Sequence, residues 1–212
     1  IWFIMSDRIH KLIEELLRWY DIHRRDLPWR NSPDVRPDPY NIWLSEVMLQ
    51  QTTVATVISY YRKFLARWPT VAKLADASLD EVLHAWQGLG YYARARNLHK
   101  CAQVIVAKYD GHFPDSVAEL LSLPGIGSYT AAAISAIAFG HKATPIDGNI
   151  ERVISRIYAI AEPLPKSKKL VRTHAESLTP DQRAGDFAQA LMDLGATICR
   201  PRFADCGFCP VL

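Results

Sequence analysis

The sequence has no apolar run that approaches the roughly 20 residues needed for a membrane span. Its first five residues, Ile-Trp-Phe-Ile-Met, are apolar, but they lack the basic start, the length and the cleavage site of a signal peptide. The charge is nearly balanced, with a net value of +3, which permits nucleic acid as a partner without arguing for it. We therefore expect a globular chain of 212 residues that forms one large domain or two small ones.

Cysteine is scarce, and its distribution is uneven. A chain of this size can build its own core, so four cysteines are a poor match for a disulfide framework. Cys199, Cys206 and Cys209 are close in sequence, and such a group of thiolates typically holds zinc or an iron–sulfur cluster. Cys101 is distant from them and is interpreted as a buried structural thiol. The group of three predicts a metal site in a reducing, cytoplasmic compartment.

The sequence also lacks the two-residue alternation that marks β-strands between hairpin turns. Apolar residues instead recur at helical spacing over residues 9–20, 54–65, 79–86 and 187–194. Capping-box patterns predict three helix starts, at Ser78 with Glu81, Ser116 with Glu119, and Thr179 with Gln182. We expect an all-α fold.

One acidic residue lies in an unusually apolar segment. Residues 40–51 leave almost no polar face, yet they include Glu46. Burial raises the pKa of a carboxyl group, which is what a general acid needs near neutral pH. A structural pair with a neighbouring Arg or Lys is the alternative interpretation. Gln50 and Gln51 extend the same polar strip.

Two further motifs lie at expected helix starts. Gly125 and Gly127 form a Gly-x-Gly turn whose backbone N–H groups could bind phosphate, although a plain helix connection has the same pattern. Asp147 precedes a helical stretch, where it is either an N-cap or a second carboxylate whose charge is held at a helix start.

Together these motifs resemble the helix-hairpin-helix DNA glycosylase superfamily, and within it the MutY-type adenine DNA glycosylases. The resemblance runs from Leu27-Pro-Trp-Arg30 to Cys209, with motifs in the family order at residues 44–52, 88–97, 123–127 and 146–149. It implies a fold of two helical modules, over residues 34–143 and over residues 1–33 with 144–212, with DNA in the groove between them. The first module would carry the hairpin and the second the cysteines.

The resemblance also implies roles for individual residues. Glu46 matches the general acid that protonates adenine, and Asp147 matches the aspartate that stabilises the sugar cation. Tyr129 stands where bifunctional relatives such as endonuclease III carry a nucleophilic lysine, which implies a monofunctional enzyme. Gln50 and Tyr91 resemble residues that enter the duplex beside the flipped base. The other implied DNA or base contacts are Trp29, Arg30, Gln51, Gly125, Gly127 and Asn149.

The three clustered cysteines match the first three ligands of a [4Fe–4S] cluster, with zinc as an alternative metal. The resemblance further implies a fourth cysteine shortly after Cys209 and a Nudix-like domain that helps recognise oxidised guanine. Neither lies within these 212 residues, so a catalytic-domain fragment and a natural short form both stay open.

The implied partner is duplex DNA with adenine opposite 8-oxoguanine or guanine, bound by a monomer. Three alternatives stay open: a mismatch thymine glycosylase, a bifunctional endonuclease III-like enzyme, and a non-catalytic DNA-binding module with a structural metal. Tyr129 argues against the bifunctional enzyme, because no amine is present there. Intact Glu46 and Asp147 argue against the non-catalytic module.

Overall fold

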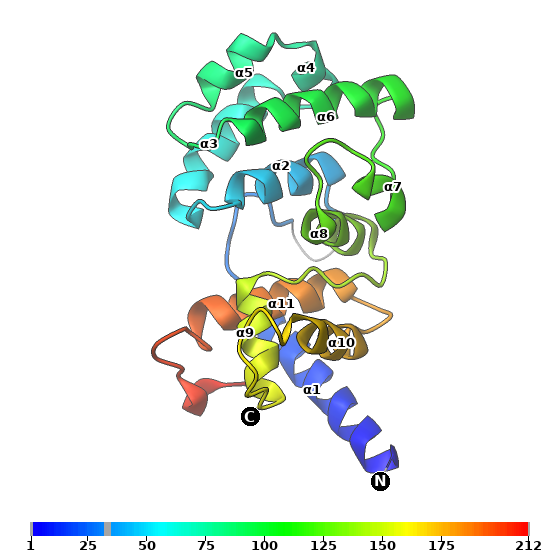
Figure 1. The fold of residues 1–212 in the computed structure, drawn as a ribbon, viewed down its shortest axis with the longest axis vertical. Helices are drawn as coiled ribbons and strands as arrows, with labels where there is room; N and C mark the ends of the chain where they lie inside the picture. The colour runs from blue at the N-terminus through cyan, green and yellow to red at the C-terminus, as the bar shows by residue number, and fades with distance from the viewer. Residues whose placement is uncertain (1, 32–34, 212) are drawn as a thin grey trace. The chain divides into compact units, whose positions relative to one another are not determined.

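The computed structural model describes residues 2–31 and 35–211, and every regular element in this part of the chain is a helix (Figure 1). The one extended pairing among these residues is an isolated bridge between Cys199 and Ala204. The predicted all-α fold is confirmed. The chain divides into two compact units, Asp26–Phe139 and Ile1–Arg25 with Gly140–Leu212. Over the residues described, no helix combines the length and the apolar character that a bilayer crossing requires.

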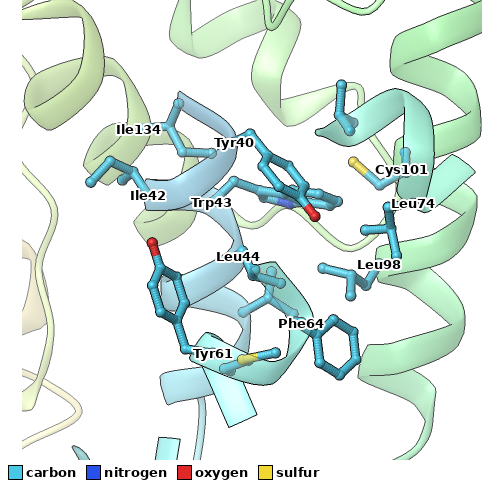
Figure 2. Packing of buried hydrophobic residues seen from close by; sticks show 14 of the residues in the cluster. Tyr40, Ile42, Trp43, Leu44, Tyr61, Phe64, Leu74, Leu98, Cys101 and Ile134 are labelled. Atoms are coloured by element: carbon cyan, nitrogen blue, oxygen red, sulfur yellow. The ribbon is translucent and has the colours of Figure 1, made fainter. Parts of the chain in front are cut away.

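The unit Asp26–Phe139 is built around one buried helix. Its helices are α2 (Pro39–Leu49), α3 (Val54–Arg67), α4 (Val71–Asp76), α5 (Leu79–Ala85), α6 (Ala93–Tyr109), α7 (Val117–Leu121) and α8 (Ser128–Phe139). Helix α2 contacts α3, α6 and α8, so its side chains are covered on several sides. Figure 2 shows Trp43 and Leu44 of α2 among Phe64 of α3, Leu98 of α6 and Ile134 of α8.

Local sequence explains where α2 begins. The Asp38 side chain accepts a hydrogen bond from the Tyr40 backbone N–H at 2.8 Å, and Pro39 occupies the first helical position, where it has no N–H to lose. The Tyr40 hydroxyl donates to the Trp68 carbonyl at 2.8 Å. This bond ties the start of α2 to the end of α3.

The second unit centres on α11 (Ala184–Thr197), which contacts both α1 (Trp2–His23) and α9 (Gly148–Ile157). It also contains α10 (Lys168–Leu178) and the 3₁₀ turn η1 (Cys206–Phe208). Buried Asp193 pairs with the Arg25 guanidinium and ties α11 to the end of α1. A Cβ atom on Gly195 would lie 2.6 Å from Cβ of Asn149, so the approach of α9 to α11 requires glycine there.

Two of the three predicted helix caps are confirmed. Ser78 forms a complete capping box with Glu81, and Ser116 accepts a hydrogen bond from the Glu119 backbone N–H. The start predicted at Thr179 is wrong. Thr179 ends α10, where its hydroxyl donates to the Ala175 carbonyl at 2.9 Å, and α11 begins only at Ala184. The hydroxyl oxygen also lies 2.7 Å from Thr144 Oγ1, so these contacts tie the Thr179 side chain to α10 and to Thr144.

Candidate active site and cysteine loop

Glu46 lies in the second half of α2 and is only 7% exposed. Buried residues follow one another along this helix from Tyr40 to Met48 with hardly a break, so the helix has no continuous polar face. Burial of this degree favours the neutral form of a carboxylic acid over the charged form. The predicted burial of Glu46 is confirmed, and its role as a general acid stays a prediction.

Helices α7 and α8 form a helix-hairpin-helix. Gly125 in its turn has a left-handed φ of 76°, and a Cβ atom there would lie 2.7 Å from Cβ of Asn97 on α6. Both constraints require glycine. Ile126 is 6% exposed and anchors the turn, whereas Gly125 and Gly127 on either side are exposed. The turn thus presents backbone to solvent directly before α8, as a phosphate site at a helix start requires.

Tyr129 is a half-buried residue in the first turn of α8. Because α8 packs on α2, the helix that bears Tyr129 is a direct neighbour of the helix that bears Glu46. The structure therefore brings the elements of these two predicted catalytic residues together in one unit.

Two short segments of this unit present side chains to solvent from left-handed backbone. The Gln loop, residues 50–52, includes exposed Gln51 at φ 57°, and the Tyr loop, residues 88–92, includes Tyr91 at φ 48° and 63% exposure. Residues other than glycine seldom adopt positive φ, and where they do, the strain is often part of a functional site. Gln50 is half-buried and ends α2 as its C-cap.

The structure places Trp29 and Arg30 differently from each other. Trp29 is 6% exposed, and its ring meets Tyr61 edge-on with the ring centroids 5.4 Å apart. It is therefore a core residue of its unit. Arg30 is half-buried, and its backbone N–H donates to the Leu27 carbonyl at 2.9 Å.

Asp147 is the N-cap of α9. Its Oδ1 accepts a hydrogen bond from the Ile150 backbone N–H at 2.7 Å, and its Oδ2 accepts one from Asn149 Nδ2 at 2.8 Å. The predicted N-cap is confirmed. Both contacts leave the carboxylate with further acceptor positions, because an ionised carboxylate offers about four.

Arg152 and Arg156 connect this helix start to the cysteine loop, which is the segment that carries Cys199, Cys206 and Cys209. Arg152 Nη2 donates to Asn149 Oδ1 at 2.8 Å, and its Nε donates to the Cys199 carbonyl at 2.8 Å. One turn further, Arg156 Nη1 lies 3.2 Å from Cys199 Sγ and donates to the Arg200 carbonyl at 2.9 Å. Sequence reasoning missed both arginines. Their spacing of four residues on α9 was the available signal.

The predicted burial of Cys101 is confirmed. Cys101 is fully buried, and burial raises the pKa of its thiol to about 12, so it is an inert core residue. Cys206 is exposed, and Cys199 and Cys209 are half-buried. Burial raises the pKa of the Cys209 thiol, and the neighbouring thiols of Cys199 and Cys206 raise it further. A hydrogen bond with the Val211 backbone acts in the opposite direction and lowers this pKa.

The donor chemistry of the loop bears on which metal group it could hold. Within residues 2–31 and 35–211, no three His, Cys, Asp or Glu side chains are grouped closely enough for a single metal ion. A multi-iron cluster separates its thiolate ligands more widely than one ion does. The three loop cysteines offer soft sulfur donors, which is the donor type that iron–sulfur clusters use, and Arg156 lies beside one of them, Cys199.

The predicted site residues divide between the two units. The unit Asp26–Phe139 carries Trp29, Arg30, Glu46, Gln50, Gln51, Tyr91, Gly125, Gly127 and Tyr129. The other unit carries Asp147, Asn149, Cys199, Cys206 and Cys209.

Residues 44–181, which include the hairpin and both predicted catalytic carboxylates, match the family described as HhH-GPD superfamily base excision DNA repair protein. The chain belongs to this superfamily. The resemblance inferred from the sequence motifs is confirmed.

Members with named activities are also similar to this chain. Adenine DNA glycosylase of Homo sapiens is 48% identical over 92% of this chain, and adenine DNA glycosylase of Mycolicibacterium smegmatis is 46% identical over 93% of it. Adenine DNA glycosylase of Buchnera aphidicola subsp. Baizongia pistaciae is 44% identical over 93% of it. The chain spans 37% of the human protein, 66% of the mycobacterial one and 56% of the Buchnera one.

Solved structures show the same fold. A thermostable thymine-DNA glycosylase superposes with a TM-score of 0.84 and 32% identity, over 98% of this chain and 94% of that one. A trapped endonuclease III–DNA covalent intermediate gives a TM-score of 0.78 over 97% and 92% of the two chains. At 24% identity, this second likeness bears on the fold alone.

Proposed function

We propose that this chain carries the catalytic region of a monofunctional adenine DNA glycosylase, which removes adenine mispaired with 8-oxoguanine or guanine. The observation that carries the proposal is Glu46, a carboxylic acid that is 7% exposed on an almost wholly apolar helix. The identities of 44% to 48% with adenine DNA glycosylases support it. The two compact units correspond in this proposal to two modules that act on one DNA duplex.

The glycosidic bond is out of reach inside a duplex, so the adenine must first be flipped out, which costs a few kcal/mol of stacking and pairing. We propose that Gln50, Gln51 and Tyr91 occupy the gap and offset that cost. The exposed backbone at Gly125 and Gly127 would hold a DNA phosphate without reading the base sequence. Trp29, Arg30 and Asn149 are proposed as pocket residues.

The chemistry assigns different protonation states to the two carboxyl groups. Adenine is a poor leaving group until its ring accepts a proton, and buried Glu46, in its neutral form, would supply that proton. As the bond breaks, the sugar becomes oxocarbenium-like, and ionised Asp147 would oppose the positive charge. Pairs of carboxyl groups whose environments separate their pKa values perform the same division in glycoside hydrolysis.

Tyr129 determines the proposed fate of the sugar. A tyrosine has no amine with which to form a Schiff base, so water attacks the sugar and the DNA strand stays intact.

The loop cysteines Cys199, Cys206 and Cys209 are proposed as three ligands of a [4Fe–4S] cluster. Such a cluster, when bound, supplies iron–sulfur bonds that cross-link the loop. Arg156 would stay beside Cys199 and balance part of the thiolate charge.

One observation favours a second candidate, removal of thymine from a mismatch. The thymine-DNA glycosylase structure superposes over 98% of this chain at 32% identity. Its identity to this chain is lower than the 44% to 48% of the adenine enzymes, so adenine is the preferred substrate.

The deciding experiment is a single-turnover comparison of three duplexes that differ only at the target pair: adenine opposite 8-oxoguanine, adenine opposite guanine, and thymine opposite guanine. We expect release of adenine from the first two and none of thymine from the third. Release of thymine alone would replace the adenine proposal with the thymine one, and release of neither base would overturn both.

A further inference from the structure

Arg94, in the first turn of α6, is a charged residue that the proposed chemistry does not use, and it is 9% exposed. Every hydrogen bond that its guanidinium makes within the described residues goes to one of two places, the end of α2 with the Gln loop, or the Tyr loop. Arg94 thus bridges the two segments that carry Gln50, Gln51 and Tyr91.

The first set of contacts is made mainly by one nitrogen. Nη1 donates to the carbonyl groups of Val47 at 3.1 Å and Met48 at 3.0 Å, and also to that of Gln50. The last carbonyl groups of a helix lack intrahelical partners and carry partial negative charge, so a cation is favourable there. Nη2 extends the contact by donating to Thr52 Oγ1 at 3.2 Å.

The second set of contacts fixes the Tyr loop. Nη2 donates to the Leu89 carbonyl at 2.9 Å and approaches that of Gly90 at 3.4 Å. The guanidinium also lies over the ring of Trp86, at 5.3 Å from the ring centroid, and over that of Tyr91, at 5.6 Å. Trp86 Nε1 donates to the Gly90 carbonyl at 3.0 Å, which adds a second donor to the same group.

The positions of two of these acceptors are informative. The Gln50 carbonyl belongs to the peptide that precedes left-handed Gln51, and the Gly90 carbonyl belongs to the peptide that precedes left-handed Tyr91. One guanidinium therefore binds the peptide group that leads into each strained residue. The planar fork of an arginine, with five N–H donors, can span both loops, whereas the point charge of a lysine cannot.

We propose that Arg94 is a positioning residue that holds the Gln loop and the Tyr loop at a fixed separation, so that both enter the duplex together. This inference rests on the proposed function, in which the two loops fill the gap left by the flipped adenine. It assigns no contact with DNA or with the reacting atoms to Arg94. Its effect passes through the loops alone.

The test compares two substrates for one variant. Arg94→Lys keeps the charge but cannot bridge both loops. Displacement of positioning groups by an ångström can lower a rate by about 10²-fold. We therefore expect a loss of that order in adenine release from the paired duplex, in which the adenine stands opposite 8-oxoguanine. Release from a duplex in which the adenine is an unpaired bulge, so that no base pair has to be broken, should stay within about threefold of the unmodified protein.

A matched control separates positioning from stability. His99 is a buried polar residue on the same helix, and its Nε2 lies 2.8 Å from the Ala77 carbonyl, away from both loops. We expect His99→Ala to lower the melting temperature but to leave the ratio of paired to bulged rates unchanged. An equal loss on both substrates for Arg94→Lys would overturn the inference, because it would indicate general destabilisation.

A second variant keeps the test decisive if Arg94→Lys does not fold. Thr52→Val removes one Arg94 contact from the Gln loop without touching the Tyr loop. If the loops are coupled, the effects of Thr52→Val and Tyr91→Ala on the paired duplex should be non-additive, with the double variant less impaired than the product of the single effects. Strict additivity would contradict the coupling.

A readout independent of excision distinguishes failure of this inference from failure of the proposed function. The duplex carries 2-aminopurine beside a target adenosine whose 2′-fluoro sugar blocks cleavage. We expect the unmodified protein to raise the 2-aminopurine fluorescence and Arg94→Lys to raise it far less at saturating protein. If the fluorescence of the two proteins differs as expected but adenine is not released from the cleavable duplex, only the glycosylase proposal is refuted. Equal fluorescence, or no rise with either protein, would overturn the positioning role.

Discussion

The substitution Asp147→Asn separates two roles of this side chain, the observed capping of α9 and the proposed stabilisation of the sugar cation. In the structure the carboxylate caps α9 through Oδ1 and accepts a hydrogen bond from Asn149 through Oδ2. Asn149 cannot reverse its amide without loss, because its Oδ1 already accepts from Arg152. An asparagine at position 147 has an NH2 group in place of one of the two carboxylate oxygens, so this NH2 group would face either the Ile150 N–H or the Asn149 amide.

These contacts set the size of the effect on stability. Asparagine caps helices about as well as aspartate, so the cap itself costs little when it is kept. Loss of one of the two hydrogen bonds and loss of the negative charge at the helix start together lower the free energy of unfolding by about 1–2 kcal/mol. For a chain of this size, that corresponds to a fall in melting temperature of about 2–8 °C. At 25 °C the variant should stay folded.

The effect on catalysis should be much larger. Removing one preorganised group that stabilises transition-state charge commonly lowers a rate by about 10²–10³-fold. We expect a single-turnover loss of that size on adenine opposite 8-oxoguanine. Asp147→Ser also keeps a capping oxygen and removes the charge, so it should melt near Asp147→Asn and show the same loss of activity.

Asp38→Asn is the matched control, since Asp38 is also an N-cap aspartate, whose side chain accepts from the Tyr40 N–H. It should excise adenine at the normal rate. If Asp147→Asn also kept its rate within a few-fold, with only the melting temperature lowered, Asp147 would be a helix cap and the electrostatic role would be refuted.

Four further predictions concern Glu46, Tyr129, the loop cysteines and the core residue Cys101. Glu46→Gln should abolish base release in single-turnover assays while duplex binding by fluorescence anisotropy is kept, because an amide cannot deliver the proton. The unmodified protein should leave abasic strands uncut without heat or alkali, whereas Tyr129→Lys should nick DNA and be trapped on it by borohydride, since lysine can form a Schiff base. The purified protein should absorb broadly in the visible range and contain iron and sulfide; zinc alone, or no metal, would contradict the cluster. Finally, burial raises the pKa of Cys101 from 9.0 to about 12, so the folded state keeps a proton that the unfolded state loses. Stability should therefore fall as pH rises from 9 toward 12, by up to about 1.4 kcal/mol per pH unit, and Cys101→Ala should remove that part of the slope in alkaline unfolding titrations.

Much of the fold could be predicted because its signals are local. Helical periodicity, the caps at Ser78 and Ser116, and the glycines of the hairpin each depend on a few neighbouring residues. The start predicted at Thr179 failed because a threonine hydroxyl can bond backward to a carbonyl as well as forward to an N–H, and the sequence pattern is the same for both.

The connecting arginines could not be found in the same way. Arg94 and Arg152 bind chiefly backbone carbonyl groups, and every residue type carries that acceptor, so no partner residue marks the contact in the sequence. The only trace of Arg94 is positional. It shares a buried face of α6 with Leu98, Cys101 and Ile105, at spacings of four, three and four residues. A charged residue on such a face needs several hydrogen bonds, which is why it joins separate segments.

The two readings of Asp147 that the sequence left open are compatible in the structure. Capping uses one position on Oδ1 and the Asn149 amide uses one on Oδ2, so a carboxylate with about four acceptor positions has others left for a substrate or water. The capping position also stabilises the negative charge of the Asp147 carboxylate, because the positive end of the helix dipole lies at this point. The bond from Asn149, itself fixed by Arg152, restricts rotation of the carboxylate. A negative charge held in one orientation before the sugar develops its positive charge needs no reorganisation during bond cleavage, and an N-cap is therefore a suitable place for the aspartate of this reaction.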